Sequence, residues 1–165
     1  MAHVPHLACL GGGVLGEPTA EVPQAALVLG HGHQDHTGGA SYLQMKYAPK
    51  VLMAAPDWAM VARNPRPDRP QPTRDMDLTD GQKLTLGDTT IAIYVTPGHT
   101  DGTLSFIFPV KDHGATRVIA YPGGTAYNFP RSVARFQSYI DTQKRFTKLV
   151  TDAGASVVLS NHSEF

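Results

Sequence analysis

The chain has little cysteine, no excess of charge of either sign and no long apolar run. Cys9 is the only cysteine among 165 residues, which excludes an internal disulfide and a cysteine-rich zinc cluster. Lys and Arg together number 14, as do Asp and Glu, so electrostatics favours neither nucleic acid nor an anionic membrane. No segment approaches the roughly 20 apolar residues of a transmembrane helix. We therefore expect no nucleic-acid partner and no membrane partner.

What is present is typical of a globular domain with mixed secondary structure. Hydrophobic residues make up 41% of the chain and charged residues 17%. Residues 1–25 lack a regular pattern, and we expect an irregular segment there. Apolar and β-branched runs predict strands at 27–29, 51–54, 83–86, 89–95, 103–110, 117–121 and 156–160. The spacing of apolar residues, with capping residues and prolines, predicts helices at 40–47, 56–62 and 131–153. Residues 63–74 are rich in proline and predict an extended loop. This mixture favours an α+β domain over 26–165, with helices on the outer faces of sheets.

The central motif is His31-Gly32-His33-Gln34-Asp35-His36, directly after an apolar strand. In extended backbone, side chains two positions apart point to the same side, so His31 and His33 can hold one ion together. Asp35 and His36 follow where the chain turns, and they are placed to face a second ion. Imidazole and carboxylate ligands suit zinc. Three imidazoles clustered without a metal would repel one another when protonated, so the motif predicts a metal site.

Two further histidines lie in comparable positions. His99 follows a strong strand within Pro97-Gly98-His99-Thr100, and His162 follows the last predicted strand within Asn161-His162. Ligands on loops at strand ends are what a rigid scaffold can bring to one site. The remaining histidines have no such context: His113 lies in a predicted turn, and His3 and His6 lie near the start of the chain, so we expect all three to be solvated.

These motifs together resemble the metallo-β-lactamase superfamily. The residues that carry the resemblance are His31-Gly32-His33-Gln34-Asp35-His36-Thr37-Gly38-Gly39, Pro97-Gly98-His99-Thr100 and Asn161-His162. The resemblance implies an αββα sandwich and a cofactor of two zinc ions. It assigns the first zinc to His31, His33 and His99, and the second to Asp35, His36 and His162.

The ligand set is most similar to the third subclass of class B β-lactamases, because the other two subclasses place a cysteine in the second site. Glyoxalase II and the acyl-homoserine lactonases add an aspartate that bridges both metals, near the end of the strand at 117–121. Residues 120–125 contain no carboxylate here. This difference favours a β-lactamase over the hydrolases that have the bridging aspartate. Only about thirty residues precede His31, so we expect a shortened or fragmentary member with an incomplete first sheet.

By this resemblance, the chain is expected to hydrolyse a small molecule. A hydroxide held by the two zinc ions would attack a β-lactam or a similar cyclic amide or ester, and Asp35 would orient it. Thr100, Thr125, Ser160 and Asn161 are candidates for orienting the ligands or binding substrate. Trp58 and Tyr127 either line a substrate pocket or, as we favour, serve packing.

Two alternatives stay open at this point: a lactone or thioester hydrolase on the same scaffold, and a non-catalytic protein that retains zinc. The resemblance implies a periplasmic or secreted protein with a role in antibiotic resistance, although the chain carries no recognisable signal peptide.

Overall fold

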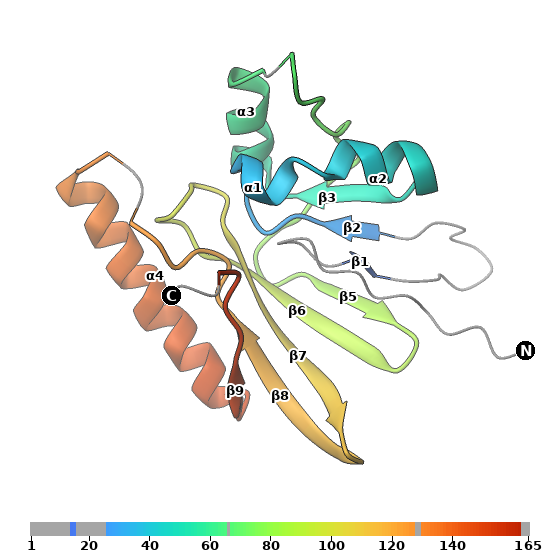
Figure 1. Ribbon diagram of the computed structural model, residues 1–165. Coiled ribbons are helices and arrows are strands. Elements are labelled where there is room, and N and C mark those ends of the chain that lie inside the picture. The colour runs from blue at the N-terminus through green and yellow to red at the C-terminus, as the bar shows by residue number, and fades with distance from the viewer. Residues whose placement is uncertain (1–13, 16–25, 66, 128–129, 163–165) are drawn as a thin grey trace, which may run out of the picture. The chain divides into compact units, whose positions relative to one another are not determined.

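The computed structural model describes residues 14–15, 26–65, 67–127 and 130–162, and Cys9, His3 and His6 lie outside them. The chain divides into two compact units, residues 1–78 and 79–165. Each unit has its own sheet (Figure 1), a four-stranded one in the first unit and a five-stranded one in the second. The predicted α+β class, with two sheets and helices, is confirmed.

The first unit contains mainly parallel strands connected by helices. Its elements are β1 (Val14–Leu15), β2 (Ala26–Val28), α1 (Gln34–Thr37), α2 (Ala40–Tyr47), β3 (Lys50–Met53), α3 (Ala55–Arg63) and β4 (Met76–Asp77). β2, β3 and β4 run parallel, and β1 pairs antiparallel with β2. The carboxyl ends of β2 and β3 therefore lie at the same edge of this sheet, where the metal motif and α3 begin.

The core of the first unit lies between this sheet and its helices. It comprises the buried side chains of Leu27, Leu29, Ala40, Val51, Met53, Trp58 and Val61. Trp58 is 4% exposed, and its indole N–H donates to the carbonyl of Met76 at 3.2 Å. The favoured packing role of Trp58 is thus confirmed.

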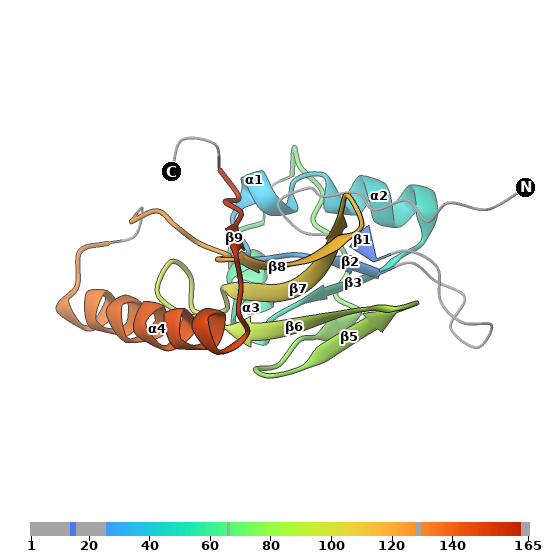
Figure 2. The same ribbon diagram turned by 90° about the horizontal axis from the view of Figure 1, so that it is seen from below.

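The second unit contains a meander of antiparallel strands followed by a long helix. Its elements are β5 (Lys83–Leu86), β6 (Thr89–Val95), β7 (Leu104–Asp112), β8 (Ala115–Tyr121), α4 (Val133–Asp152) and β9 (Val157–Val158). β9 pairs parallel with β8 and completes the sheet. α4, orange to red in Figures 1 and 2, contacts β6 through the rings of Phe146 and Tyr94, whose centroids are 6.2 Å apart.

Most of the predicted elements are present with nearly the expected bounds. The main differences are three short elements outside the predicted ranges, and one of them is β4, which pairs with β3. Val14–Leu15 form β1 inside the segment expected to be irregular, because their backbone pairs with β2. Gln34–Thr37 form a single helical turn, α1, within the metal motif itself. Among the residues that the structure describes, no helix is both long and apolar enough to cross a membrane.

Candidate metal centre

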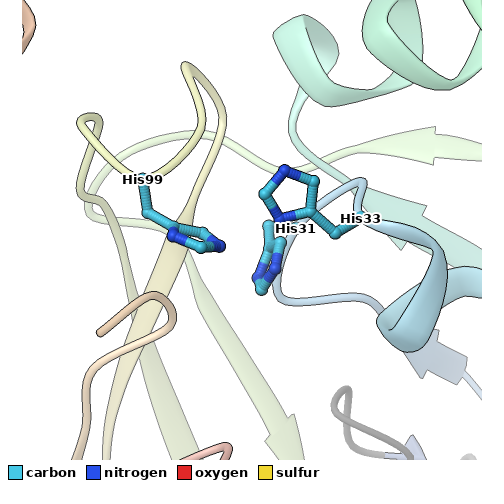
Figure 3. A group of neighbouring side chains, drawn as sticks. All are labelled: His31, His33 and His99. Carbon is cyan, nitrogen blue, oxygen red and sulfur yellow. The ribbon is translucent and has the colours of Figure 1, made fainter. Parts of the chain in front are cut away.

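The first unit brings together the four ligands that the His31–His36 motif predicts. His31 is fully buried and His36 is 4% exposed, although imidazoles are seldom so completely covered. The ring centroids of His31 and His33 lie 4.9 Å apart, and those of His31 and His36 lie 3.9 Å apart. Asp35 approaches His36, with 3.3 Å between a carboxylate oxygen and Nε2. Figure 3 shows His31 and His33 on the loop between β2 and α1.

The single turn of α1 separates the ligands of the motif into two pairs with different backbone conformations. His33 is the last extended residue before the helix, with φ −69° and ψ 152°, and its carbonyl accepts the backbone N–H groups of His36 and Thr37. Asp35 and His36 therefore lie on helical backbone, whereas His31 and His33 precede it. The buried imidazoles and the exposed carboxylate give a donor set that fits zinc. Without an ion, this packing would bring protonated imidazoles into repulsion.

The second unit places its predicted ligands at one edge of its sheet. His99 lies in the loop between β6 and β7 (Figure 3), and His162 follows β9. β6, β8 and β9 all end at this edge, because β8 and β9 are parallel and β7 is antiparallel to both β6 and β8. The chain order alone does not show this convergence; the strand pairing does.

His99 is held in one orientation by the loop after β8. It is 4% exposed, and its Nδ1 lies 2.8 Å from the carbonyl oxygen of Ala126. A carbonyl can only accept, so Nδ1 carries the proton and Nε2 keeps its lone pair for a metal. Gly124 packs on the other side of His99: a Cβ at that position would lie 2.5 Å from the His99 Cβ. The loop therefore requires glycine at this position.

The four residues predicted to support the ligands all make contacts in the second unit. The Thr100 hydroxyl shares a 2.7 Å hydrogen bond with that of Thr103 inside the His99 loop. Asn161 donates from its side chain to the carbonyl of Gly123 at 2.9 Å, and it accepts from the Thr125 hydroxyl at 3.4 Å. The Ser160 hydroxyl accepts the backbone N–H of His162 at 3.2 Å. The contacts of Asn161 tie the His162 segment to the loop after β8, and those of Thr100 and Ser160 lie within the ligand-bearing loops themselves. The functional roles stay predictions.

Tyr139, on α4, is a supporting residue that the sequence did not indicate. Its hydroxyl donates to the carbonyl of Gly124 at 3.1 Å. Burial, with Tyr127 nearby, raises the pKa of the Tyr139 phenol, so this group keeps its proton as a donor. Its ring also fills the space beside Gly98, whose φ of +143° and close packing both require glycine. No periodicity in α4 distinguishes Tyr139 from an ordinary core residue.

The other candidates lie away from these clusters. His113 occupies a turn with φ +47°, and its side chain is 99% exposed, so the expectation that it is solvated is confirmed. Tyr127 is 60% exposed, and its ring lies 5.8 Å from that of Phe136 and 4.8 Å from that of Tyr139. It packs on α4 along one side of an open groove.

Comparison with known proteins agrees with these features. The sequence profile of the metallo-beta-lactamase superfamily matches residues 23–114, more than half of the chain. The chain belongs to this superfamily.

Similar proteins include hydroxyacylglutathione hydrolases. That of Maricaulis maris is 32% identical over 98 residues, which cover 59% of this chain and 32% of the relative. That of Acidiphilium cryptum is 33% identical over 82 residues, which cover 50% of this chain and 30% of the relative. The chain thus spans about a third of the length of these curated relatives.

Similar solved structures include metallo-β-lactamases. A subclass B3 enzyme of Bradyrhizobium japonicum has a TM-score of 0.68 and 19% identity, covering 96% of this chain and 78% of its own. A metallo-β-lactamase from Legionella gormanii has a TM-score of 0.68 and 18% identity, covering 93% and 73%. At these identities the similarity establishes the fold alone, and it confirms the predicted metallo-β-lactamase fold class.

Proposed function

We propose that this chain is a zinc-dependent hydrolase that opens a β-lactam or a similar cyclic amide or ester. In this proposal, one group of residues, His31, His33 and His99, would hold one ion, and a second group, Asp35, His36 and His162, would hold another. The observation that carries the proposal is the buried packing of His31 against two further imidazoles, next to a carboxylate. The two proposed zinc ions correspond to these two groups of ligands.

When bound, zinc ions supply a water of lowered pKa and polarise the carbonyl group of the substrate. The protein residues provide position and proton handling. Asp35 has a side chain that is 59% exposed, so its carboxylate can accept a hydrogen bond from the attacking water and aim it at the carbonyl carbon. The contact of His99 Nδ1 with the Ala126 carbonyl orients the ring and leaves Nε2 as the nitrogen that would bind a metal.

A thioester hydrolase is the second candidate, supported by the identity of 32% with a hydroxyacylglutathione hydrolase. Hydrolases of that type resemble glyoxalase II, which adds an aspartate that bridges both metal ions. Residues 120–127 contain no acidic side chain. In the same stretch, Gly124 packs against His99 so closely that any side chain would displace it. These two observations favour the β-lactam substrate class.

The experiment measures zinc content and hydrolysis by the purified chain. We expect about two zinc ions per chain and faster turnover of nitrocefin than of a hydroxyacylglutathione thioester or a homoserine lactone. Faster thioester turnover would select the second candidate. Zinc without turnover of any substrate would indicate a non-catalytic zinc protein, and absence of zinc would refute the ligand assignment. A role in antibiotic resistance depends on the first outcome, and a periplasmic or secreted location stays a prediction.

The Asp35→Asn variant tests the role of the carboxylate. Asparagine keeps the shape of the side chain but loses its charge, so we expect kcat to fall by about 10²–10⁴-fold, the usual contribution of a positioned base. His113→Ala serves as the matched control, because the His113 side chain is 99% exposed. If both variants keep the activity of the unmodified chain, Asp35 does not take part in the reaction.

A further inference from the structure

Asp57 is a buried carboxylate that the proposed reaction does not use. Its residue is 1% exposed, and it lies in the first turn of α3, in the first unit. A carboxylate is almost never fully buried unless it has partners that replace its hydration. The N-terminal turn of a helix partly offsets this cost, because the helix dipole favours negative charge there. What Asp57 contacts therefore indicates why it is buried.

One partner of Asp57 is the backbone of the metal motif. Asp57 Oδ2 accepts the N–H of Gly32 at 2.7 Å, across 25 positions of sequence. Gly32 lies between His31 and His33, the two histidines proposed to hold one ion together. Hydrogen bonds to an ionised acceptor are short and about twice as strong as neutral ones. This contact from Asp57 thus holds the His31–Gly32 peptide, which lies between the two ligands.

The packing around Gly32 supports the same interpretation. A Cβ on Gly32 would lie 2.8 Å from the Cε of Met60, 3.1 Å from the carbonyl oxygen of Asp57 and 3.2 Å from a methyl group of Val61. The metal motif therefore lies directly against α3, and a side chain at position 32 would have to displace the Met60 methyl group and shift its other neighbours by a few tenths of an ångström. Glycine permits the close approach that the hydrogen bond requires.

The topology makes this contact possible. β2 and β3 are parallel neighbours, so the chain leaves both strands at the same sheet edge. The metal motif follows β2, and Ala54 and α3 follow β3. The first turn of α3 therefore lies beside the loop that carries the ligands.

We propose that Asp57 is a positioning residue that fixes the Gly32 peptide and thereby sets His31 and His33 for metal binding. This inference rests on the proposed function, since it assigns a purpose to the same ligands. In this proposal Asp57 acts through the backbone of the loop and is not itself one of the ligands. The side-chain oxygen, rather than the negative charge alone, is the essential feature.

The test compares Asp57→Ala, which removes the acceptor, with Asp57→Asn, which keeps an acceptor oxygen. Zinc affinity is measured by competition with a chelator, and ligand geometry by the visible spectrum of the cobalt-substituted chain. We expect Asp57→Ala to weaken zinc binding by about 10–100-fold, the usual effect of removing a residue that orients ligands, and to alter the cobalt spectrum. Asp57→Asn should restore most of the affinity and the original spectrum.

Asp75→Ala is the matched control. The Asp75 carboxylate also accepts a backbone N–H, that of Val51 at 3.0 Å, but near the amino end of β3, opposite the metal motif. Its loss should lower stability without changing zinc affinity or the cobalt spectrum. If Asp57→Ala behaves like Asp75→Ala, or if Asp57→Asn binds zinc as weakly as Asp57→Ala, the inference is wrong.

Two measurements separate failure of the inference from failure of the proposed function. If the unmodified chain binds no zinc, the proposed function fails; if it and Asp57→Ala bind zinc equally, only the inference fails. If Asp57→Ala does not fold, the rate of amide hydrogen exchange at Gly32 is measured in the unmodified chain and in Asp57→Asn, and this rate tests the contact. Slow exchange in both supports the contact, and exchange at the rate of an open loop in the unmodified chain contradicts it.

Discussion

Gly124→Ala tests whether the shape of the loop after β8 holds His99 in place. An added Cβ would lie 2.5 Å from the His99 Cβ, 2.6 Å from its Cγ and 2.8 Å from its Cδ2. Carbon atoms prefer a separation of about 3.5–4.0 Å, so the two residues would have to separate by about 1 Å. The Gly124 carbonyl is held by the Tyr139 hydroxyl at 3.1 Å. Much of the displacement should therefore fall on His99.

A displacement of this size has a predictable kinetic effect. Misplacing a catalytic group by 1 Å can reduce a rate by about 10²-fold. We therefore expect Gly124→Ala to lower kcat/KM by about 10²-fold and to lower the zinc content at limiting metal. The assays are hydrolysis of the substrate that the unmodified chain turns over fastest, and zinc analysis after dialysis against a weak chelator.

Gly154→Ala is the control for strain without displacement of a ligand. Gly154 has φ +64°, and no atom of the described residues lies within 4 Å of an added Cβ. This variant should lose about 1–2 kcal/mol of stability, because alanine is disfavoured in left-handed backbone. It should keep the zinc content and kcat/KM. If Gly124→Ala keeps both as well, or if Gly154→Ala loses them equally, the loop does not position His99.

Three further predictions concern single side chains. His99→Ala should lower zinc content and reduce hydrolysis by on the order of 100-fold or more, whereas His113→Ala should change neither; equal effects would contradict the ligand assignment. Tyr139→Phe should cost about 1 kcal/mol of unfolding free energy, measured by urea denaturation, through the lost hydrogen bond to the loop; an unchanged stability would count against that contact. Burial alone would raise the pKa of the Asp75 carboxyl, but its hydrogen bonds from the backbone and from Lys50 and Gln44 hold that pKa below its ordinary value. Asp75 should therefore stabilise the fold above about pH 4 and lose this effect as the pH falls through its lowered pKa. Asp75→Ala should accordingly destabilise at pH 7 and progressively less as the pH falls below about 4.

Local sequence signals predicted the elements well where each element has its own start and stop residues. The helix expected at 40–47 is present as α2 with the same bounds, and the chain turns at Ala48, with φ +51°, just before Pro49. α4 begins after Ser132, whose hydroxyl accepts a backbone N–H at 3.5 Å. Apolar spacing did not show which face of α4 is covered: Val133 is 88% exposed and Ile140 44%. The buried stripe instead passes through Tyr139, which bonds to a loop outside the helix.

The difference between local sequence signals and contacts between distant residues also explains which parts of the candidate centre could be predicted. His31 to His36 lie on one short loop, so their spacing reveals a ligand cluster before any fold is known. Asp57 supports that loop from the next parallel strand and helix, at a separation of 25 residues, and an aspartate early in a helix looks like an ordinary capping residue. It becomes recognisable only when β2 and β3 are known to be parallel neighbours. A search for residues that support such loops should therefore examine the first turn of the helix after the adjacent strand, where topology brings an acidic side chain to the backbone between two ligands.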